Sequence, residues 1–294
     1  PLTNDTVTVG GDLFAEGEGA TYNVTGSQTV VGSSKNFFDY TLNEGTKADN
    51  YNITKTEGTL TVTGRDAKYE ITVEAKSDST KYDGEEHSVS GFEQTRFLVE
   101  GNTYTVEGLT AKAKGTDAGE YTANVTGTAV VKDKDGNDVT EQFSVKTQNG
   151  TLTISKRAVT LTSATDSKQY DGTPLTNDTV TVGGDGFVEG QGATYNVTGS
   201  QTIVGSSENF FEYRLNDGTS EDNYNITTAN GTLTVTNRDA KYEITVEANS
   251  GKFKYDGTEK TVSGLVTNTF EIKGVTFTVE NMSAEATETD AGVY

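Results

Sequence analysis

Apolar and polar residues alternate along short segments of this chain. Residues 69–75 show the pattern clearly, with apolar side chains at every second position: Tyr69, Ile71, Val73 and Ala75. Successive side chains of a β-strand point to opposite faces, so these four share one face. The alternation recurs at Tyr22 and Val24; Phe38, Tyr40 and Leu42; Tyr51 and Ile53; Tyr104 and Val106; and Tyr121, Ala123 and Val125. It predicts antiparallel sheets with one buried face and one wet face.

The segments between these strands carry turn residues, and no long segment has the apolar spacing of a helix. Asp-Gly and Asn-Gly pairs tolerate the positive φ angles of tight hairpins. They occur at Asp83-Gly84, Asp135-Gly136, Asn149-Gly150, Asp171-Gly172, Asp217-Gly218, Asn230-Gly231 and Asp256-Gly257. Two such sheets packed face to face form a sandwich of about a hundred residues. We therefore expect an all-β fold of tandem Ig-like antiparallel β-sandwich modules in an elongated array.

The chain is a tandem repeat, because residues 1–121 recur as residues 174–294 without a gap. Two motifs subdivide the repeat. Tyr-Asp-Gly triplets stand at Tyr82-Asp83-Gly84, Tyr170-Asp171-Gly172 and Tyr255-Asp256-Gly257, and a closing Gly-Thr-Leu-Thr-Val/Ile formula begins at Gly58, Gly150 and Gly231. Two module types, A and B, alternate. Their predicted bounds are 1–64 (A, truncated at its N-terminus), 65–157 (B), 158–237 (A) and 238–294 (B, truncated at its C-terminus).

A late tyrosine in each module is the strongest local signal. Asp117-Ala118-Gly119-Glu120-Tyr121 resembles the tyrosine corner of Ig-like sandwiches, in which the hydroxyl bonds back to the preceding loop and fixes the crossing between sheets. Module A has Tyr51 and Tyr224 at the matching place. We interpret these tyrosines and the Tyr-Asp-Gly triplets as structural residues.

Composition removes several functional classes. The net charge of −21 disfavours nucleic acid and anionic lipid as partners. No cysteine is present for a disulfide or a thiolate metal site, and no apolar run is long enough to cross a bilayer. The single histidine, His87, aligns with Lys260, so the two copies cannot share a histidine-dependent catalytic site. We expect no enzymatic activity, and we interpret His87 as a polar residue on a strand edge.

Calcium is the one cofactor that the acidic residues suggest. Asp133 and Asp135 alternate in residues 132–138, but lysines separate them and the bidentate glutamate of a calcium loop is missing. A hairpin turn is the better interpretation of this segment. Asp66 and Asp239, at the junctions between modules, form the alternative site.

The doubled aromatics Phe37-Phe38 and Phe210-Phe211 form a possible contact patch. Only one of two neighbouring strand residues can face the core. We expect the other to be covered by a loop or by the next module, or to bind a ligand.

The order of these motifs is similar to that of a known family. A Tyr-Asp-Gly triplet, a late Asp-Ala-Gly-x-Tyr or Asp-Asn-Tyr, and a closing Gly-Thr-Leu-Thr-Val/Ile together resemble the YDG/MBG-type repeats of large bacterial surface proteins. The resemblance covers nearly the whole chain. It implies an extracellular stalk or adhesin array on the bacterial surface, cell-wall anchored through regions outside this segment, and it supplies no catalytic residues.

Three functions follow as expectations. The first is a structural stalk that presents a distal binding tip and makes weak multivalent contacts. The second is a repeat module that binds glycan, mucin or host glycoprotein. The third is a self-associating filament or surface layer. The expected partners are the neighbouring repeats of the same chain and these extracellular ligands, without nucleic acid and without membrane insertion by this segment.

Overall fold

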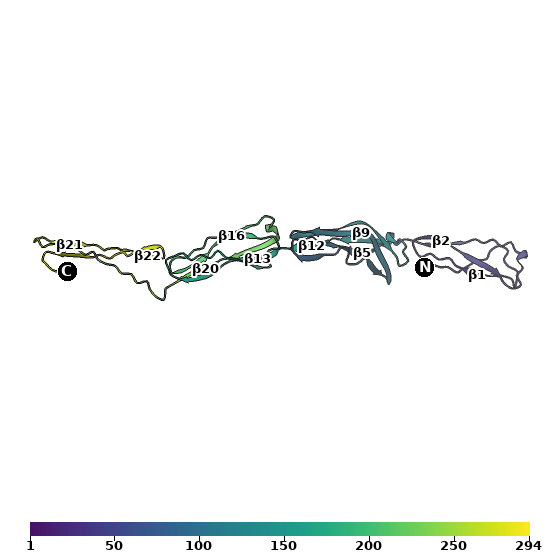
Figure 1. Ribbon diagram of the computed structural model, residues 1–294. Helices are drawn as coiled ribbons and strands as arrows, with labels where there is room; N and C mark the ends of the chain where they lie inside the picture. Colours follow the sequence, from purple (N-terminus) through teal and green to yellow (C-terminus); the bar gives the residue numbers. More distant parts are fainter. The chain divides into compact units, whose positions relative to one another are not determined.

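The computed structural model describes residues 1–294. The chain is all-β, with three single-turn 3-10 helices and no α-helix. It divides into two compact units, Pro1–Ser155 and Lys156–Tyr294. Figure 1 colours the first unit from purple to teal and the second from green to yellow. Each unit contains one module in which the sheets are complete and one in which they are sparse.

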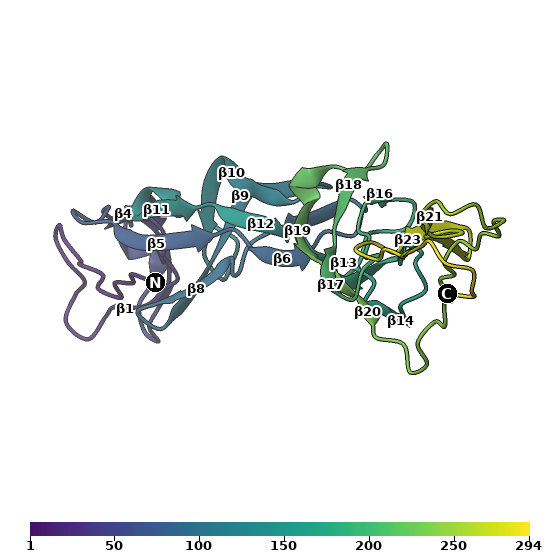
Figure 2. The same cartoon turned by 90° about the vertical axis from the view of Figure 1, so that its left-hand side faces the viewer.

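Residues 65–157 form the complete module of the first unit. Its strands are β5 (Tyr69–Glu74), β6 (Asp78–Lys81), β7 (His87–Ser90), β8 (Arg96–Val99), β9 (Asn102–Gly115), β10 (Gly119–Lys132), β11 (Phe143–Gln148) and β12 (Gly150–Ser155), with helix η2 (Thr140–Gln142) before β11. One sheet has the order β6-β12-β10-β9-β7, with β8 also on β9, and β5 pairs with β11 in a second sheet. Figure 2 shows the long strands β9 and β10 curving side by side.

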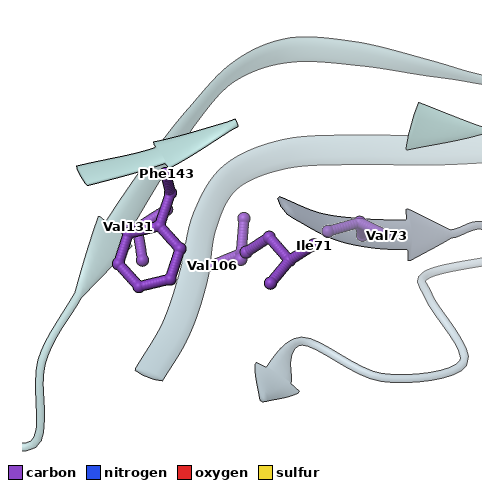
Figure 3. Packing of buried hydrophobic residues seen from close by; sticks show 5 residues of the cluster. All are labelled: Ile71, Val73, Val106, Val131 and Phe143. Carbon is purple, nitrogen blue, oxygen red and sulfur yellow. The ribbon is translucent and has the colours of Figure 1, made fainter. Parts of the chain in front are cut away.

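A small aliphatic and aromatic cluster lies between these two sheets. Ile71, Val73, Val106, Val131 and Phe143 are the buried members of the cluster (Figure 3). They come from β5, β9, β10 and β11, so the cluster ties together strands that are far apart in the sequence. Full burial of each such side chain contributes about 1.5–3 kcal/mol. The alternation seen in residues 69–75 thus places its apolar residues in the core.

Residues 158–237, together with Arg157 at the start of the first strand, form the complete module of the second unit. Its strands are β13 (Arg157–Ser163), β14 (Asp166–Gln169), β15 (Val180–Gly184), β16 (Ala193–Val197), β17 (Gly205–Asn209), β18 (Phe211–Leu215), β19 (Tyr224–Ala229) and β20 (Gly231–Thr236), with helix η3 (Glu221–Asn223) before β19. Three small sheets have the orders β15-β13-β19, β14-β20-β17 and β16-β18.

The first strand of each complete module corrects the expectation of purely antiparallel sheets. β5 pairs with β11 and β6 pairs with β12 in parallel, and β13 pairs with β19 and β14 with β20 in the same way. The first strand is therefore divided between two sheets and runs beside the last two strands in their direction. Residue alternation reports which side chains share a face, and it carries no information about strand direction.

The other two modules have fewer strands. Residues 1–64 contain β1 (Ala20–Val24), β2 (Gly32–Asn36), β3 (Phe38–Leu42), η1 (Ala48–Asn50) and β4 (Gly58–Val62). Residues 238–294 contain β21 (Lys260–Ser263), β22 (Thr269–Ile272), β23 (Val275–Thr278) and β24 (Glu285–Glu288). The strand expected at Tyr51 and Ile53 is absent. Its counterpart β19 is paired with β13, and residues 1–64 contain no strand that corresponds to β13.

Two of the glycine pairs act differently from the prediction. Gly84, Gly136, Gly172, Gly218 and Gly257 have positive φ angles, as a tight turn requires. Gly150 and Gly231 do not have positive φ angles. A Cβ atom at Gly150 would lie 2.1 Å from the carbonyl oxygen of Lys76, and one at Gly231 would lie 2.3 Å from that of Ala164. These two glycines let the last strand pass close to the bend in the first strand.

Candidate functional site at the Tyr-Asp-Gly turns and the module junction

The aspartate of each Tyr-Asp-Gly triplet holds its own turn closed. The carboxylate accepts a hydrogen bond from the backbone amide two residues later: Glu85 to Asp83 at 2.9 Å, Thr173 to Asp171 at 3.1 Å and Thr258 to Asp256 at 3.0 Å. A short acidic side chain is suited to this bond with its own backbone. The triplet thus encodes a turn of the same local structure three times.

A basic side chain contacts each of these carboxylates. His87 Nε2 lies 2.9 Å from Asp83, and Lys260 Nζ lies 2.9 Å from Asp256, each from four residues further along the chain. In the third turn Lys168 Nζ lies 2.9 Å from Asp171. His87 and Lys260 therefore serve as equivalent basic partners of the turn aspartate in the two copies. The alignment of the two residues did not by itself indicate this contact.

These contacts lower the pKa of each carboxyl. At Asp171 the bonds from Lys168 and Thr173 hold the pKa well below its usual range. At Asp256 the bonds from Thr258 and Lys260 lower the pKa to about 2. At Asp83 the amide of Glu85 is the main cause and His87 adds to it. The folded chain therefore favours the charged form of all three carboxyls.

The tyrosine of the triplet anchors the turn to the closing strand. The Tyr82 amide donates to the Ser155 carbonyl at 2.9 Å, and the Tyr170 amide donates to the Thr236 carbonyl at 2.9 Å. Tyr82 is buried, with 3% of its surface exposed, whereas Tyr255 is 69% exposed in the module that has no closing strand. The ring is thus part of the core only where the last strand covers it.

In the second unit, the turn of module A also contacts the following module B. Lys273, at the tip of the β22–β23 hairpin, places Nζ 3.3 Å from Asp171. The rings of Tyr170 and Phe277 meet edge to face with centroids 6.5 Å apart. A Cβ atom at Gly172 would lie 2.7 Å from the Phe277 ring, so only glycine leaves room for this contact. We call Tyr170, Asp171, Gly172, Lys273 and Phe277 the junction contact.

The residues between these modules reinforce the junction contact. The Arg238 guanidinium lies 4.0 Å from the ring centroid of Tyr242 and donates to the Tyr170 carbonyl at 3.4 Å. Gln169 Nε2 donates to Asp239 at 2.7 Å. A cation over an aromatic face contributes about 0.5–1 kcal/mol at an exposed site. The linker therefore bonds to both modules that it joins.

The linker of the first unit has the same arginine–tyrosine pair. Arg65 lies 3.9 Å from the Tyr69 ring centroid and donates to the Tyr69 hydroxyl at 2.8 Å. The Arg65 amide donates to Gln142 Oε1 at 3.0 Å. The triplet Arg-Asp-Ala stands at both junctions, at residues 65–67 and 238–240, whereas nothing in the sequence marked Lys273 or Phe277 as contacts.

The acidic residues considered for calcium are arranged as follows. Asp133 accepts bonds from the amides of Asp135 and Asn137 and from the Asn137 side chain, each at 2.9 Å. Asp135 pairs with Lys134 at 2.7 Å. Asp239 is the acceptor for Gln169, and Asp66 is exposed in the linker. No group of three or more potential metal-ligating side chains of histidine, aspartate or glutamate comes together in the chain.

The late tyrosines fall into two kinds. The Tyr121 hydroxyl donates to the Asp117 carbonyl at 2.9 Å, four residues earlier, as a tyrosine corner does. In module A the hydroxyl instead reaches a loop far upstream. Tyr224 accepts from the Val188 amide at 3.1 Å and donates to Gln191 at 2.5 Å, while Tyr51 bonds to Ala15 and Glu18. The expected bond to the preceding loop is therefore wrong for module A.

The aromatic pairs have one inward and one outward member. Phe38 packs edge to face on Tyr22, and Phe211 on Tyr195, with centroids 6.3 and 6.4 Å apart. Phe37 is 50% exposed and Phe210 is 56% exposed. Each copy of module A therefore presents an uncovered phenylalanine at the same place.

No protein-family model, curated protein or solved structure matches this chain. No helix has the length and apolar character needed to span a membrane. The assignment of a function therefore depends on the physical arrangement described above and on the resemblance of the motifs.

Proposed function

We propose that this chain is a structural repeat region, or stalk, of a bacterial cell-surface adhesin. In this proposal the A and B modules are Ig-like sandwiches in an elongated extracellular array that presents a distal binding tip. The array is anchored to the cell wall by regions outside this segment. The resemblance to YDG/MBG-type repeats supports the location, and the pairing of the first and last strands supports the mechanical role.

The parallel pairing of β6 with β12 is the observation that carries the mechanical role. Tension along the chain pulls β6 toward its N-terminal end and β12 toward its C-terminal end. Because the strands are parallel neighbours, this loads their hydrogen bonds together in shear. β14 and β20 have the same arrangement in module A. Each complete module thus resists extension by bonds that must break together.

The junction contact supports the same proposal. A stalk transmits force and direction only if each module keeps a fixed orientation relative to the next one. The Asp171–Lys273 and Tyr170–Phe277 contacts, together with the short linker, restrict the motion between residues 158–237 and the following module. The Tyr-Asp-Gly triplets and the Arg–Tyr pairs of the linkers recur in this chain, whereas Lys273 aligns with Glu100 in the other B copy.

Single-molecule force spectroscopy on the full chain, pulled from its two ends, tests the load-bearing role. We expect two high-force unfolding events, one from residues 65–157 and one from residues 158–237, and lower forces from the other two modules. A Gly150→Ala variant should lower only the event of residues 65–157. If the complete modules extend at forces no higher than the sparse modules, the mechanical proposal is wrong.

A further inference from the structure

An opening separates strands β5 and β8 in the complete module of residues 65–157. A cavity of about 440 Å³ lies between them, lined by residues 70–72, Gln94 and residues 96–99. β5 is paired with β11 and β8 with β9, so each of the two strands has an edge without a paired strand. Figure 2 shows β5 and β8 diverging from each other. We call this opening the β5–β8 slot.

The slot begins at a break in the segment that leads into β8. The Glu93 amide donates to the Glu74 carbonyl of β5 at 3.0 Å, whereas the Thr95 carbonyl accepts from the Val106 amide of β9 at 2.8 Å. In a regular strand, two residues that are two positions apart direct their backbone groups to the same side. The change of side at Gln94 therefore turns β8 away from β5 and opens the slot.

Backbone groups of both strands point into the slot. The Ala75 amide donates to β11 at 2.9 Å, so the alternation along β5 directs the amides and carbonyls of Glu70 and Thr72 to the other edge. The bond to β9 described above has the same effect on β8, where it directs the amides and carbonyls of Arg96 and Leu98 away from β9. Two unpaired edges thus border one space, and an extended backbone placed between them can bond to both.

The side chains around the slot form an apolar floor and an outer rim. Ile71 is a buried member of the core cluster, and Phe97 and Val99 pack against that cluster. Arg96 and Leu98 point to the outer side, where Leu98 is 73% exposed. Because side chains of a strand alternate between two faces, a strand in the slot would place every second residue on the floor and the intervening residue at the rim.

Charge selects the residue that would lie at the rim. Glu70 and Arg96 are the charged residues of the slot lining. Glu70 pairs with Lys146 at 2.9 Å, whereas Arg96 is exposed and has no ion pair. The uncompensated charge of the slot is therefore positive, although the chain as a whole carries −21. A carboxylate is the matching group, because it accepts two parallel hydrogen bonds from a guanidinium.

We propose that the β5–β8 slot binds an extended segment of another polypeptide in which an acidic residue stands between two aliphatic residues. The aliphatic side chains lie on the floor of Ile71, Phe97 and Val99, and the carboxylate contacts Arg96 at the rim. Backbone bonds to both edges supply affinity, as in strand addition to a sheet. The volume of about 440 Å³ limits the contact to a few residues of the partner. This inference does not depend on the stalk proposal.

The break that opens the slot recurs in the second copy of module B. There the Val266 amide donates to the Glu247 carbonyl, and the Val279 amide donates to the Asn268 carbonyl, each at 2.8 Å. These four residues align with the four that define the break in the first copy. The divergence of the two segments is therefore a property of the module type and does not depend on one local sequence.

The floor and the rim differ in how they vary between the two copies. The floor is apolar in both, with Ile244, Phe270 and Ile272 at the aligned positions. At the rim, Thr269 stands in place of Arg96 and Glu271 in place of Leu98. The selectivity for a carboxylate therefore belongs to the slot of residues 65–157, which is the copy that has the arginine.

The module that precedes module B leaves the slot accessible. In the second unit, module A contacts the following hairpin at Lys273 and Phe277. These residues align with Glu100 and Tyr104, which lie outside the slot lining. At this end of the slot the Tyr69 hydroxyl donates to Glu100 at 2.7 Å. This exposed side-chain bond can open without the loss of any backbone pairing.

Fluorescence anisotropy of the labelled peptide Gly-Thr-Val-Glu-Val-Thr-Gly, titrated with the full chain, tests the proposal. We expect saturable binding at one site. A peptide with lysine in place of the glutamate should bind at least about fivefold more weakly, because it loses the ion pair with Arg96 and places two cations together. Hydrogen exchange in the bound chain should slow at residues 70–72 and 96–98, which gain backbone partners only if the peptide enters as a strand.

Arg96→Glu gives a matched test of the rim. Arg96 makes no ion pair in the folded chain, so we expect the variant to keep its melting temperature and to reverse the preference between the glutamate and lysine peptides. Arg214→Glu changes the net charge by the same amount at an exposed position of β18, far from the slot in the sequence. It should keep the preference of the unaltered chain.

Four results would overturn the proposal. The first is absence of binding of the glutamate peptide, and the second is equal affinity of the two peptides for the unaltered chain and for Arg96→Glu. The third is binding without protection of residues 70–72 and 96–98, since it would place the peptide elsewhere. The fourth is a dimer of the chain alone in which these residues are already protected, since it would assign the slot to a second copy.

Discussion

At the scale of single residues, the glycines and acidic residues have functions that composition only partly reveals. The Asp-Gly pairs were predicted as turns and have the expected positive φ angles at Gly84, Gly136, Gly172, Gly218 and Gly257. Gly150 and Gly231 belong to equally typical pairs, yet they serve close packing of two strand backbones. Sequence cannot separate these two uses of glycine, because the second depends on a strand that lies far away in the chain.

Gly150→Ala should destabilise the module of residues 65–157 by about 1–3 kcal/mol, because a methyl group would collide with the Lys76 carbonyl that the fold holds in place. Urea denaturation followed by tyrosine fluorescence or circular dichroism measures the change. Gly64→Ala is the control and should leave the transition within about 0.5 kcal/mol of the unaltered chain. Equal midpoints for both variants would contradict the close-approach explanation.

At the scale of elements, the sequence predicted strands and faces more successfully than partners. The strand at Tyr69, Ile71 and Val73 was correctly placed, with its apolar face in the core. The parallel pairing of the first strand was missed, because alternation does not encode direction. The strand predicted at Tyr51 and Ile53 is absent, since a strand needs a neighbour as well as a pattern. Of the candidate site, the triplets were found from repetition, whereas the hairpin that docks on one of them was not.

The turn at Asp171 gives this module a pH dependence with a defined sign. Its carboxyl has a lowered pKa in the folded chain, so the bonds from Lys168 and Thr173 stabilise the fold above the usual aspartate pKa of about 3.9. This stabilisation is lost as the pH falls from that value toward the lower folded pKa. Asp171→Asn, which cannot ionise, should give a shallower fall of melting temperature between pH 5 and pH 2.5.

Calorimetry on both proteins across this pH range makes the comparison. Identical slopes for the variant and the unaltered chain would show that the charge of Asp171 does not contribute to stability. Lys273→Ala separates the two sources of the effect, because it removes the cation from the following module and keeps Lys168 and Thr173 in place.

At the scale of the whole molecule, the repetition of modules and the net charge determine which external partners the chain can bind. The exposed Phe37 and Phe210 are equivalent positions of two A modules, so a weak contact by one can be reinforced by the other. This favours weak multivalent binding of glycoprotein or mucin as a second candidate function. The net charge of −21 disfavours acidic surfaces, which makes neutral glycans the better match.

Binding of the chain to a surface coated with neutral glycoprotein tests this candidate. If the two phenylalanines act together, Phe37→Ala and Phe210→Ala should each reduce retention by about tenfold or more, because either change removes the multivalent gain. Phe38→Leu keeps an apolar residue on the inner face and serves as the control. Retention that is equal for all variants would exclude the exposed phenylalanines as a contact patch.

The junction contact has a consequence for how such a chain can change its length. Its turn comes from module A and its hairpin from the module B that follows, so both halves lie within one A–B period. Insertion or removal of a whole A–B period leaves every A turn followed by a B hairpin. The other B copy has Glu100 at the position of Lys273, so the ion pair with the turn aspartate forms only with the hairpin that carries the lysine. Deletion of a single module B would instead set an A turn against another module A, which has no counterpart of Lys273 or Phe277. Whole A–B periods are therefore the units that keep a hairpin beside each turn, and only a B module with a lysine at this position keeps the ion pair.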